Sequence, residues 1–231
     1  MRQVVPVGPW LWVAAAISLG LSLTSWGQIL LYAFRLLTTW VHECGHALAT
    51  VVLGGSVISI LIQPDASGIT QSLIPAGRIT QGVVASSGYL GASAVGCLLM
   101  AAVRRDRWTR TIIWVTGTSM LLTLVIWMRN LFGVVVVLAW AGALVSLARK
   151  GSRHAARFAL SLLAIQVALN SVYDIRVLFL LDGGHSDAET MASLFLLPPW
   201  LWASSWMLMS VGMLGWTLWR TRVQTTREYG R

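Results

Sequence analysis

Charged residues are scarce in this chain, and acidic ones are scarcer still. Of the 231 residues only 11% are charged, with 8 Asp and Glu against 17 Lys and Arg. A soluble globular protein carries about a quarter charged residues, so this chain has too few to cover a surface in water. Because 56% of the residues are hydrophobic and the mean hydropathy is +0.71, the composition is typical of an integral membrane protein. It excludes disordered and collagen-like chains.

The cysteines and the placement of the basic residues narrow the possible classes of protein further. The sequence has 2 cysteines, Cys44 and Cys97, both within apolar stretches, so no disulfide framework is indicated. Basic residues form no block on a polar domain, and for that reason the net charge of +9 does not indicate a nucleic-acid partner. They lie in short loops between apolar runs, where they set orientation in the lipid bilayer.

The apolar runs predict about seven transmembrane helices, since a span needs about 20 apolar residues. They cover roughly residues 10–25, 29–53, 81–103, 111–128, 131–148, 155–181 and 200–219. Residues 57–75 instead alternate apolar and polar side chains around a Pro-Asp-Ala-Ser-Gly cluster, which predicts a β-hairpin. The expected fold class is an all-α polytopic membrane protein with a short β-hairpin after the second helix.

The distribution of basic residues predicts the orientation of these spans. Twelve of the 17 Lys and Arg follow the third, fifth and seventh spans, which an alternating chain places on one side of the membrane. Cytoplasmic loops carry the excess of Lys and Arg. We therefore expect the N-terminus outside and the C-terminus in the cytoplasm, in a bacterial cell membrane.

Acidic residues inside the spans are the strongest functional signal. Only Glu43 and Asp174 lie well inside apolar runs. A charged side chain in the bilayer core costs about 2.5–3.5 kcal/mol even on the lenient insertion scale. Residues of this kind persist where they face a partner, a cavity or an ion.

Glu43 belongs to the motif H-E-C-G-H at residues 42–46. The i, i+4 spacing places His42 and His46 on one helix face, where both can bind one Zn²⁺. Glu43 could then act as general base toward a zinc-bound water, whose pKa zinc lowers to about 7. The alternative is a pair of core histidines bonded to the backbone, but it leaves Glu43 buried without a partner.

Zinc needs at least one more protein ligand, and the sixth span offers candidates. Gln166, Asn170 and Asp174 recur every four residues and form a polar stripe on an otherwise apolar helix, which should point into the bundle. Asp174 is the leading candidate for the third ligand. Its alternative role is a buried salt bridge with Arg35 or Arg176.

The order of these elements resembles the site-2 protease family of intramembrane zinc metalloproteases. The resemblance rests on H-E-C-G-H-A in a span, Gly-Gly at 54–55, a hairpin, and G-Y-L-G at 88–91. The resemblance is closest to the small branch without PDZ domains, the peptidase M50B-like proteins. Y-D-I at 173–175 and S-D-A at 186–188 resemble the later signatures of that branch. The resemblance covers roughly residues 29–206.

The resemblance implies roles for several residues. It favours Asp174 as the third zinc ligand, with Asp187 as the rival because it opens a helix as the family's ligand does. Asn170 would position the substrate. The hairpin would hold the substrate as an added strand. The family keeps its metal near the cytoplasmic side, whereas the charge distribution here places the hairpin outside.

We therefore expect an intramembrane zinc metalloprotease, a zinc metalloendopeptidase that hydrolyses a peptide bond of a membrane-embedded protein. The alternative from another class is a non-proteolytic, zinc-containing accessory subunit of a membrane complex, which the small size favours. A transporter is a third possibility. The expected organisation is a first span and linker (1–28), a metalloprotease-like transmembrane domain (29–219) and a basic cytoplasmic tail (220–231).

Overall fold

The computed structural model describes residues 13–179 and 186–229, except 15, 19 and 22. The described residues between 13 and 21 are helical. The elements that follow are α2 (Ser25–Val52), β1 (Ser56–Ile62), β2 (Gly68–Leu73), α3 (Arg78–Val103), α4 (Asp106–Ile126), α5 (Leu131–Lys150), α6 (Arg153–Val177), α7 (Asp187–Phe195) and α8 (Pro199–Tyr229). A mostly helical fold with one antiparallel hairpin after the second helix is confirmed.

Within the described residues, four helices are long and apolar enough to cross a membrane: α3, α4, α5 and α6. The pair α7 and α8, bent by 117°, adds a fifth if it forms one broken span. The chain is thus a multi-pass membrane protein, but the predicted count of seven spans is not confirmed. Parts of the first and sixth predicted spans lie outside the described residues, and α2 is too polar to qualify. Helix α8 continues to Tyr229, so residues 220–229 of the predicted tail are helical.

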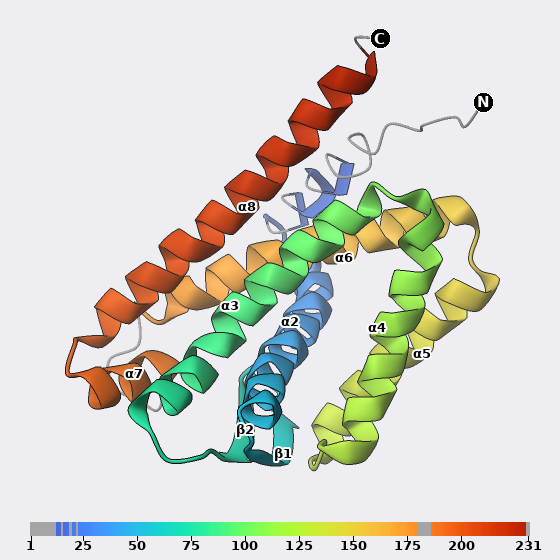
Figure 1. Cartoon of the computed structure of the whole chain (residues 1–231). Helices are drawn as coiled ribbons and strands as arrows, with labels where there is room; N and C mark the ends of the chain where they lie inside the picture. Colours follow the sequence, from blue (N-terminus) through green and yellow to red (C-terminus); the bar gives the residue numbers. More distant parts are fainter. Residues whose placement is uncertain (1–12, 15, 19, 22, 180–185, 230–231) are drawn as a thin grey trace.

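The long helices run between two ends of the bundle (Figure 1). At one end, which we call the arginine end, Arg104 Nη1 donates to the carbonyl of Arg220 at 3.5 Å, and Arg110 Nη2 donates to that of Gly151 at 2.6 Å. The opposite hairpin end carries the two strands, the turn between α4 and α5, and α7. Among the described residues, the connections after α3 and α5 and the residue Arg220 of α8 thus lie at one end, as the sequence predicted.

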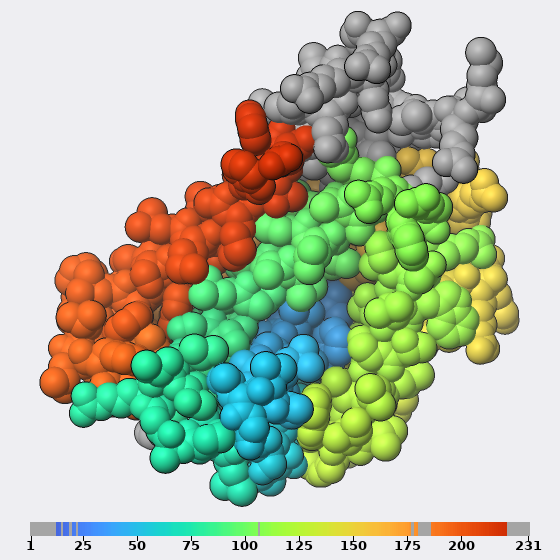
Figure 2. All heavy atoms as spheres, in the orientation of Figure 1, coloured from blue at the N-terminus to red at the C-terminus, as the bar shows by residue number. Residues whose placement is uncertain are grey.

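Helix α2 lies in the interior of the bundle. It packs against α3, α5, α6 and both strands, and Figure 2 shows it at the floor of the hollow between α3 and α4. All residues from Leu36 to Val41 are buried. The helix is therefore surrounded by protein along its middle, and this shelter permits polar side chains that a lipid-facing helix could not carry.

Polar side chains on one face of α2 hold the hairpin. The hydroxyl of Tyr32 donates to the carbonyl of Pro64, Thr39 Oγ1 donates to that of Ala66 at 2.7 Å, and Thr50 Oγ1 donates to Ser72 Oγ at 3.3 Å. The three positions in α2 are 7 and 11 residues apart, and at about 100° per residue these spacings share one face. The hairpin is thus fixed along the length of α2.

The outer edge of β1 is closed by the turn between α4 and α5. Ile60 N–H donates to the carbonyl of Trp127 at 2.7 Å, and Arg129 N–H donates to that of Ile60 at 3.3 Å. The side-chain amide of Asn130 then bonds both backbone groups of Ile62, accepting at 3.2 Å and donating at 2.6 Å. Asn130 thereby takes the place of a neighbouring strand, so this edge cannot accept another chain.

Candidate metal centre

Two imidazoles project from the hairpin-end half of α2. His42 and His46 are one turn apart, and their rings meet edge to face with centroids 4.7 Å apart. Helix α2 continues to Val52 and ends before Gly54, whose φ of 82° an L-residue rarely adopts. The helix therefore extends beyond both histidines and holds them on a regular backbone.

The third member of the cluster is Asp187, the first residue of α7. Ser186 caps this helix by accepting the N–H of Glu189 at 3.2 Å, as in a capping box. Ala188 and Met191 are buried in a cluster with Trp206 and residues of α3 and α6. Capping and packing together place the start of α7 beside α2.

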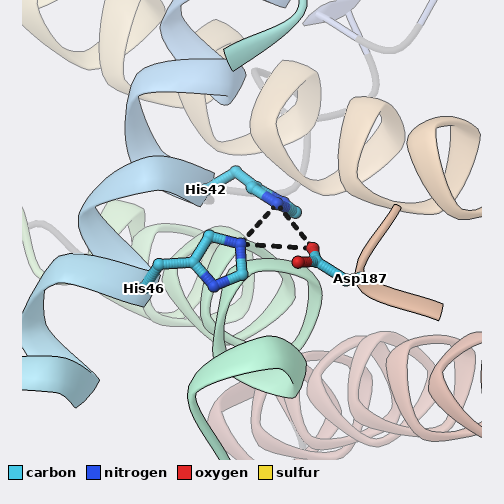
Figure 3. A group of neighbouring side chains, drawn as sticks. All are labelled: His42, His46 and Asp187. Carbon is cyan, nitrogen blue, oxygen red and sulfur yellow. Dashed lines mark hydrogen bonds and ion pairs between the residues drawn. The ribbon is translucent and has the colours of Figure 1, made fainter. Parts of the chain in front are cut away.

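The three side chains converge on one point (Figure 3). Asp187 Oδ2 lies 3.3 Å from His42 Nε2 and 3.2 Å from His46 Nε2, and the two Nε2 atoms are 2.9 Å apart. Tetrahedral zinc with ligands at about 2.0–2.1 Å requires ligand atoms about 3.3 Å apart. The triangle fits a metal ion of this size with little movement, and it is the one group of this kind among the described residues.

The orientation of His46 also suits metal binding. Its Nδ1 lies 2.7 Å from the carbonyl oxygen of Val84. A carbonyl only accepts, so Nδ1 carries the proton and Nε2 keeps its lone pair toward the centre. A hydrogen bond from the distal nitrogen to a backbone carbonyl is the usual support for a metal-binding histidine.

Helix α3 forms one wall of the centre. A Cβ on Gly88 would overlap Nε2 of both His42 and His46, and a Cβ on Gly45 would overlap the carbonyl oxygen of Ser87. Only glycine allows the two helices to approach this closely. The next residue, Tyr89, packs its ring edge to face on His42 at 4.5 Å and stacks on Trp206 at 5.2 Å.

The carboxylate of Glu43 is buried and held by the hairpin. Thr70 Oγ1 donates to Glu43 Oε2 at 2.6 Å. A Cβ on Gly68 would lie 2.5 Å from Glu43 Oε1, so glycine is needed at this point of β2. An electrostatic interaction links Glu43 to His46. The acid that the motif predicted as the base thus has a specific partner, Thr70, and lies next to the histidines.

The polar stripe of α6 faces α2 and the helical segment that precedes it, but it does not join the triangle. Asn170 Nδ2 donates to Thr38 Oγ1 at 3.3 Å, and Gln166 Nε2 donates to Ser18 Oγ at 2.8 Å. One turn beyond Asn170, Asp174 interacts electrostatically with His42 and Arg35. No ion pair joins Asp174 to Arg35 or Arg176 among the described residues. The geometry brings Asp187, the rival ligand, into the cluster.

The outer edge of β2 is open, in contrast to that of β1. Ile60 and Ile62 direct their backbone groups away from β2, so their partners Thr70 and Gly68 are non-hydrogen-bonded pairs. The backbone groups of Gly68, Thr70 and Ser72 therefore point outward from the sheet. Within the part of the chain that is described, no hydrogen bond to them is present.

Sequence reasoning did not single out Gly68 and Thr70. A signal was available, because strand alternation places Gly68, Thr70 and Ser72 on one face. Two of these three side chains are polar and the third position has none, so this face suits contact with a polar helix face. The partner of that face cannot be read from the strand itself.

The family model described as Peptidase M50B-like matches residues 4–217. No curated protein and no solved structure matches the chain.

Proposed function

Because the chain belongs to the peptidase M50B-like family, we propose that it is an intramembrane zinc metalloprotease that hydrolyses a peptide bond of a membrane-embedded protein. The observation that carries this proposal is the triangle of His42, His46 and Asp187. Two imidazoles and one carboxylate are a donor set found in catalytic zinc sites, which keep a fourth position for water or substrate.

The metal would be held by His42 Nε2, His46 Nε2 and Asp187 Oδ2, the three atoms that converge. Zinc bound there supplies Lewis acidity toward a peptide carbonyl and lowers the pKa of water. In this proposal Asp187 takes the role for which the sequence favoured Asp174. Asp174 lies outside the triangle, near His42 and Arg35.

Glu43 is proposed as the general base and general acid. Its Oε2 accepts the hydroxyl of Thr70, and Oε1 has no hydrogen-bond partner among the described residues. Glu43 would accept a proton from the attacking water as the new C–O bond forms. It would then return this proton to the nitrogen as the C–N bond breaks, so that protons balance over the cycle.

The open edge of β2 is the proposed docking site for the substrate. An extended peptide that pairs with Gly68, Thr70 and Ser72 would become a third strand beside Glu43, with main-chain hydrogen bonds as the source of affinity. Closure of the other edge by Asn130 leaves one place in the sheet for that strand. Asn170, which donates to Thr38, is a further candidate for substrate positioning.

Glu43→Gln tests the activity, since it preserves shape and packing while it removes the base. We expect purified variant protein to keep about one zinc per chain and to lose cleavage of a co-expressed membrane substrate. His46→Ala is the matched control and should lose both zinc and cleavage. If the chain were an accessory subunit, Glu43→Gln would have no phenotype while His46→Ala would destabilise the protein.

The arginine end is proposed to face the cytoplasm of a bacterial cell, with the C-terminus inside. The N-terminus is proposed to lie outside, which additionally requires the first predicted span to cross the membrane. His46 is six residues from the end of α2, or about 9 Å, so the metal centre would lie near the outer face. Single cysteines at Ser152 and Thr225 should be labelled only from the cytoplasmic side, and one at Ser67 only from outside. Cytoplasmic labelling at Ser67 would reverse the orientation.

A further inference from the structure

Thr70 belongs to the open edge of the hairpin and also donates a side-chain hydrogen bond to Glu43. Its backbone groups belong to the open edge of β2, where a substrate strand would pair. Its side chain points to α2, and Oγ1 lies 2.6 Å from Glu43 Oε2 and 3.1 Å from the Glu43 carbonyl oxygen. No other described side chain donates a hydrogen bond to the Glu43 carboxylate.

The hydrogen bond between Thr70 and Glu43 is directional. A hydroxyl has one proton to donate, and the shorter distance assigns it to the carboxylate. Bonds from a hydroxyl to an ionised acceptor are about twice as strong as neutral ones. On the other side of the carboxylate, Gly68 leaves no room for a side chain. The two β2 residues therefore restrict the rotation of Glu43 from opposite oxygens.

From this arrangement we propose that Thr70 is a positioning residue that couples substrate docking to the base. The Thr70 hydroxyl already holds Glu43 in place, so a substrate strand that pairs with the Thr70 backbone would lie in a defined position relative to that carboxylate. This inference rests on the proposed protease function. It assigns to the hairpin a second role besides holding the substrate, namely the orientation of the proton-transfer group.

Thr70→Val and Thr70→Ser test the proposal, because valine keeps the branched shape without the hydroxyl and serine keeps the hydroxyl. In the full chain reconstituted in lipid, Thr70→Val should retain zinc and lower kcat about tenfold to a hundredfold, as small misplacements of catalytic groups do. KM should change less than kcat. Thr70→Ser should restore most of the rate.

Thr118→Val is the matched control. The Thr118 hydroxyl donates only within α4, to Trp114 and Val115, and the residue is exposed. Activity should not change. If Thr70→Val cleaves as fast as the unaltered chain, or if Thr70→Ser is as slow as Thr70→Val, the positioning role is wrong.

A second measurement is independent of cleavage. Thermal unfolding of Thr70→Val, Glu43→Gln and the double variant forms a double-mutant cycle. We expect the double variant to lose less in Tm than the sum of the single losses, because both single changes act on the same hydrogen bond: valine removes its donor, and glutamine replaces the charged acceptor by a neutral, weaker one. Additive losses would overturn the proposal. An inactive but zinc-bound native chain would instead refute the protease function, and the cycle would then report only whether Thr70 and Glu43 interact.

Discussion

Helices α2 and α5 are both long enough to cross a membrane, yet they differ in which of their residues are buried by the rest of the protein. Helix α5 is apolar until Arg149 and Lys150 in its last turn, and it qualifies as a span. Its buried residues Gly133, Val137, Ala141, Leu144 and Ala148 form one narrow stripe. Helix α2 is buried over consecutive positions and does not qualify. A hydropathy average reflects expected contact with lipid, whereas the middle of α2 is shielded from lipid by its neighbours.

The burial of α2 requires hydrogen-bond partners for its polar side chains, and α5 has no such requirement. Each buried polar group in α2 needs a partner, since an unsatisfied one costs about 1–3 kcal/mol. Trp40 Nε1 accordingly donates to Thr123 Oγ1 of α4 at 2.9 Å, Thr38 Oγ1 donates to the carbonyl of Phe34 at 3.0 Å, and Glu43 bonds Thr70. The function of α2 therefore depends on other elements, and changes in those elements should damage it more than changes in α5.

The largest effect is expected from Asp187, which lies in α7 rather than in α2. Asp187→Ala removes one of three converging donors, so zinc content in the purified protein should fall well below half of the normal value. Asp174→Ala should keep most of the zinc, because Asp174 lies outside the triangle. The measurement is metal analysis of both variants after purification without chelators.

The same pair can also contradict the geometry. Loss of zinc in Asp174→Ala with retention in Asp187→Ala would transfer the ligand role back to the residue that the sequence favoured. Both aspartates come from the same half of the chain and both carry a charge near His42. The two variants are therefore matched controls for each other.

This pair of aspartates also shows what a sequence can predict. The motif at 42–46 and the hairpin at 57–75 could be recognised because their periods are local, about 3.6 and 2 residues. The choice between Asp174 and Asp187 depends on the bend of 117° between α7 and α8 and on packing of α7 against Trp206. Neither the bend nor this packing leaves a pattern among neighbouring residues of the sequence. The same holds for Asn130, whose side chain completes a strand 68 residues away.

The smaller effects concern glycines, and they compare the two helices most directly. Gly88 of α3 borders the histidines of α2, whereas Gly142 of α5 has open space where a Cβ would lie. Gly88→Ala should displace α3 from α2, lower zinc content and lower Tm by several degrees, because a rigid backbone must move. Gly142→Ala adds only helix propensity, at most about 1 kcal/mol, so zinc content should be unchanged and Tm equal or slightly higher.

The outcome for these two glycines would decide whether α2 depends on its neighbours as the structure implies. Equal zinc content in both variants would mean that α3 can retreat from α2 without disturbing His42 and His46. In that case the close approach at Gly88 would serve packing alone. A zinc loss confined to Gly88→Ala would instead show that the histidines are positioned by the wall opposite them, and not only by the helix that carries them. Metal analysis and thermal unfolding of the two purified variants separate these results.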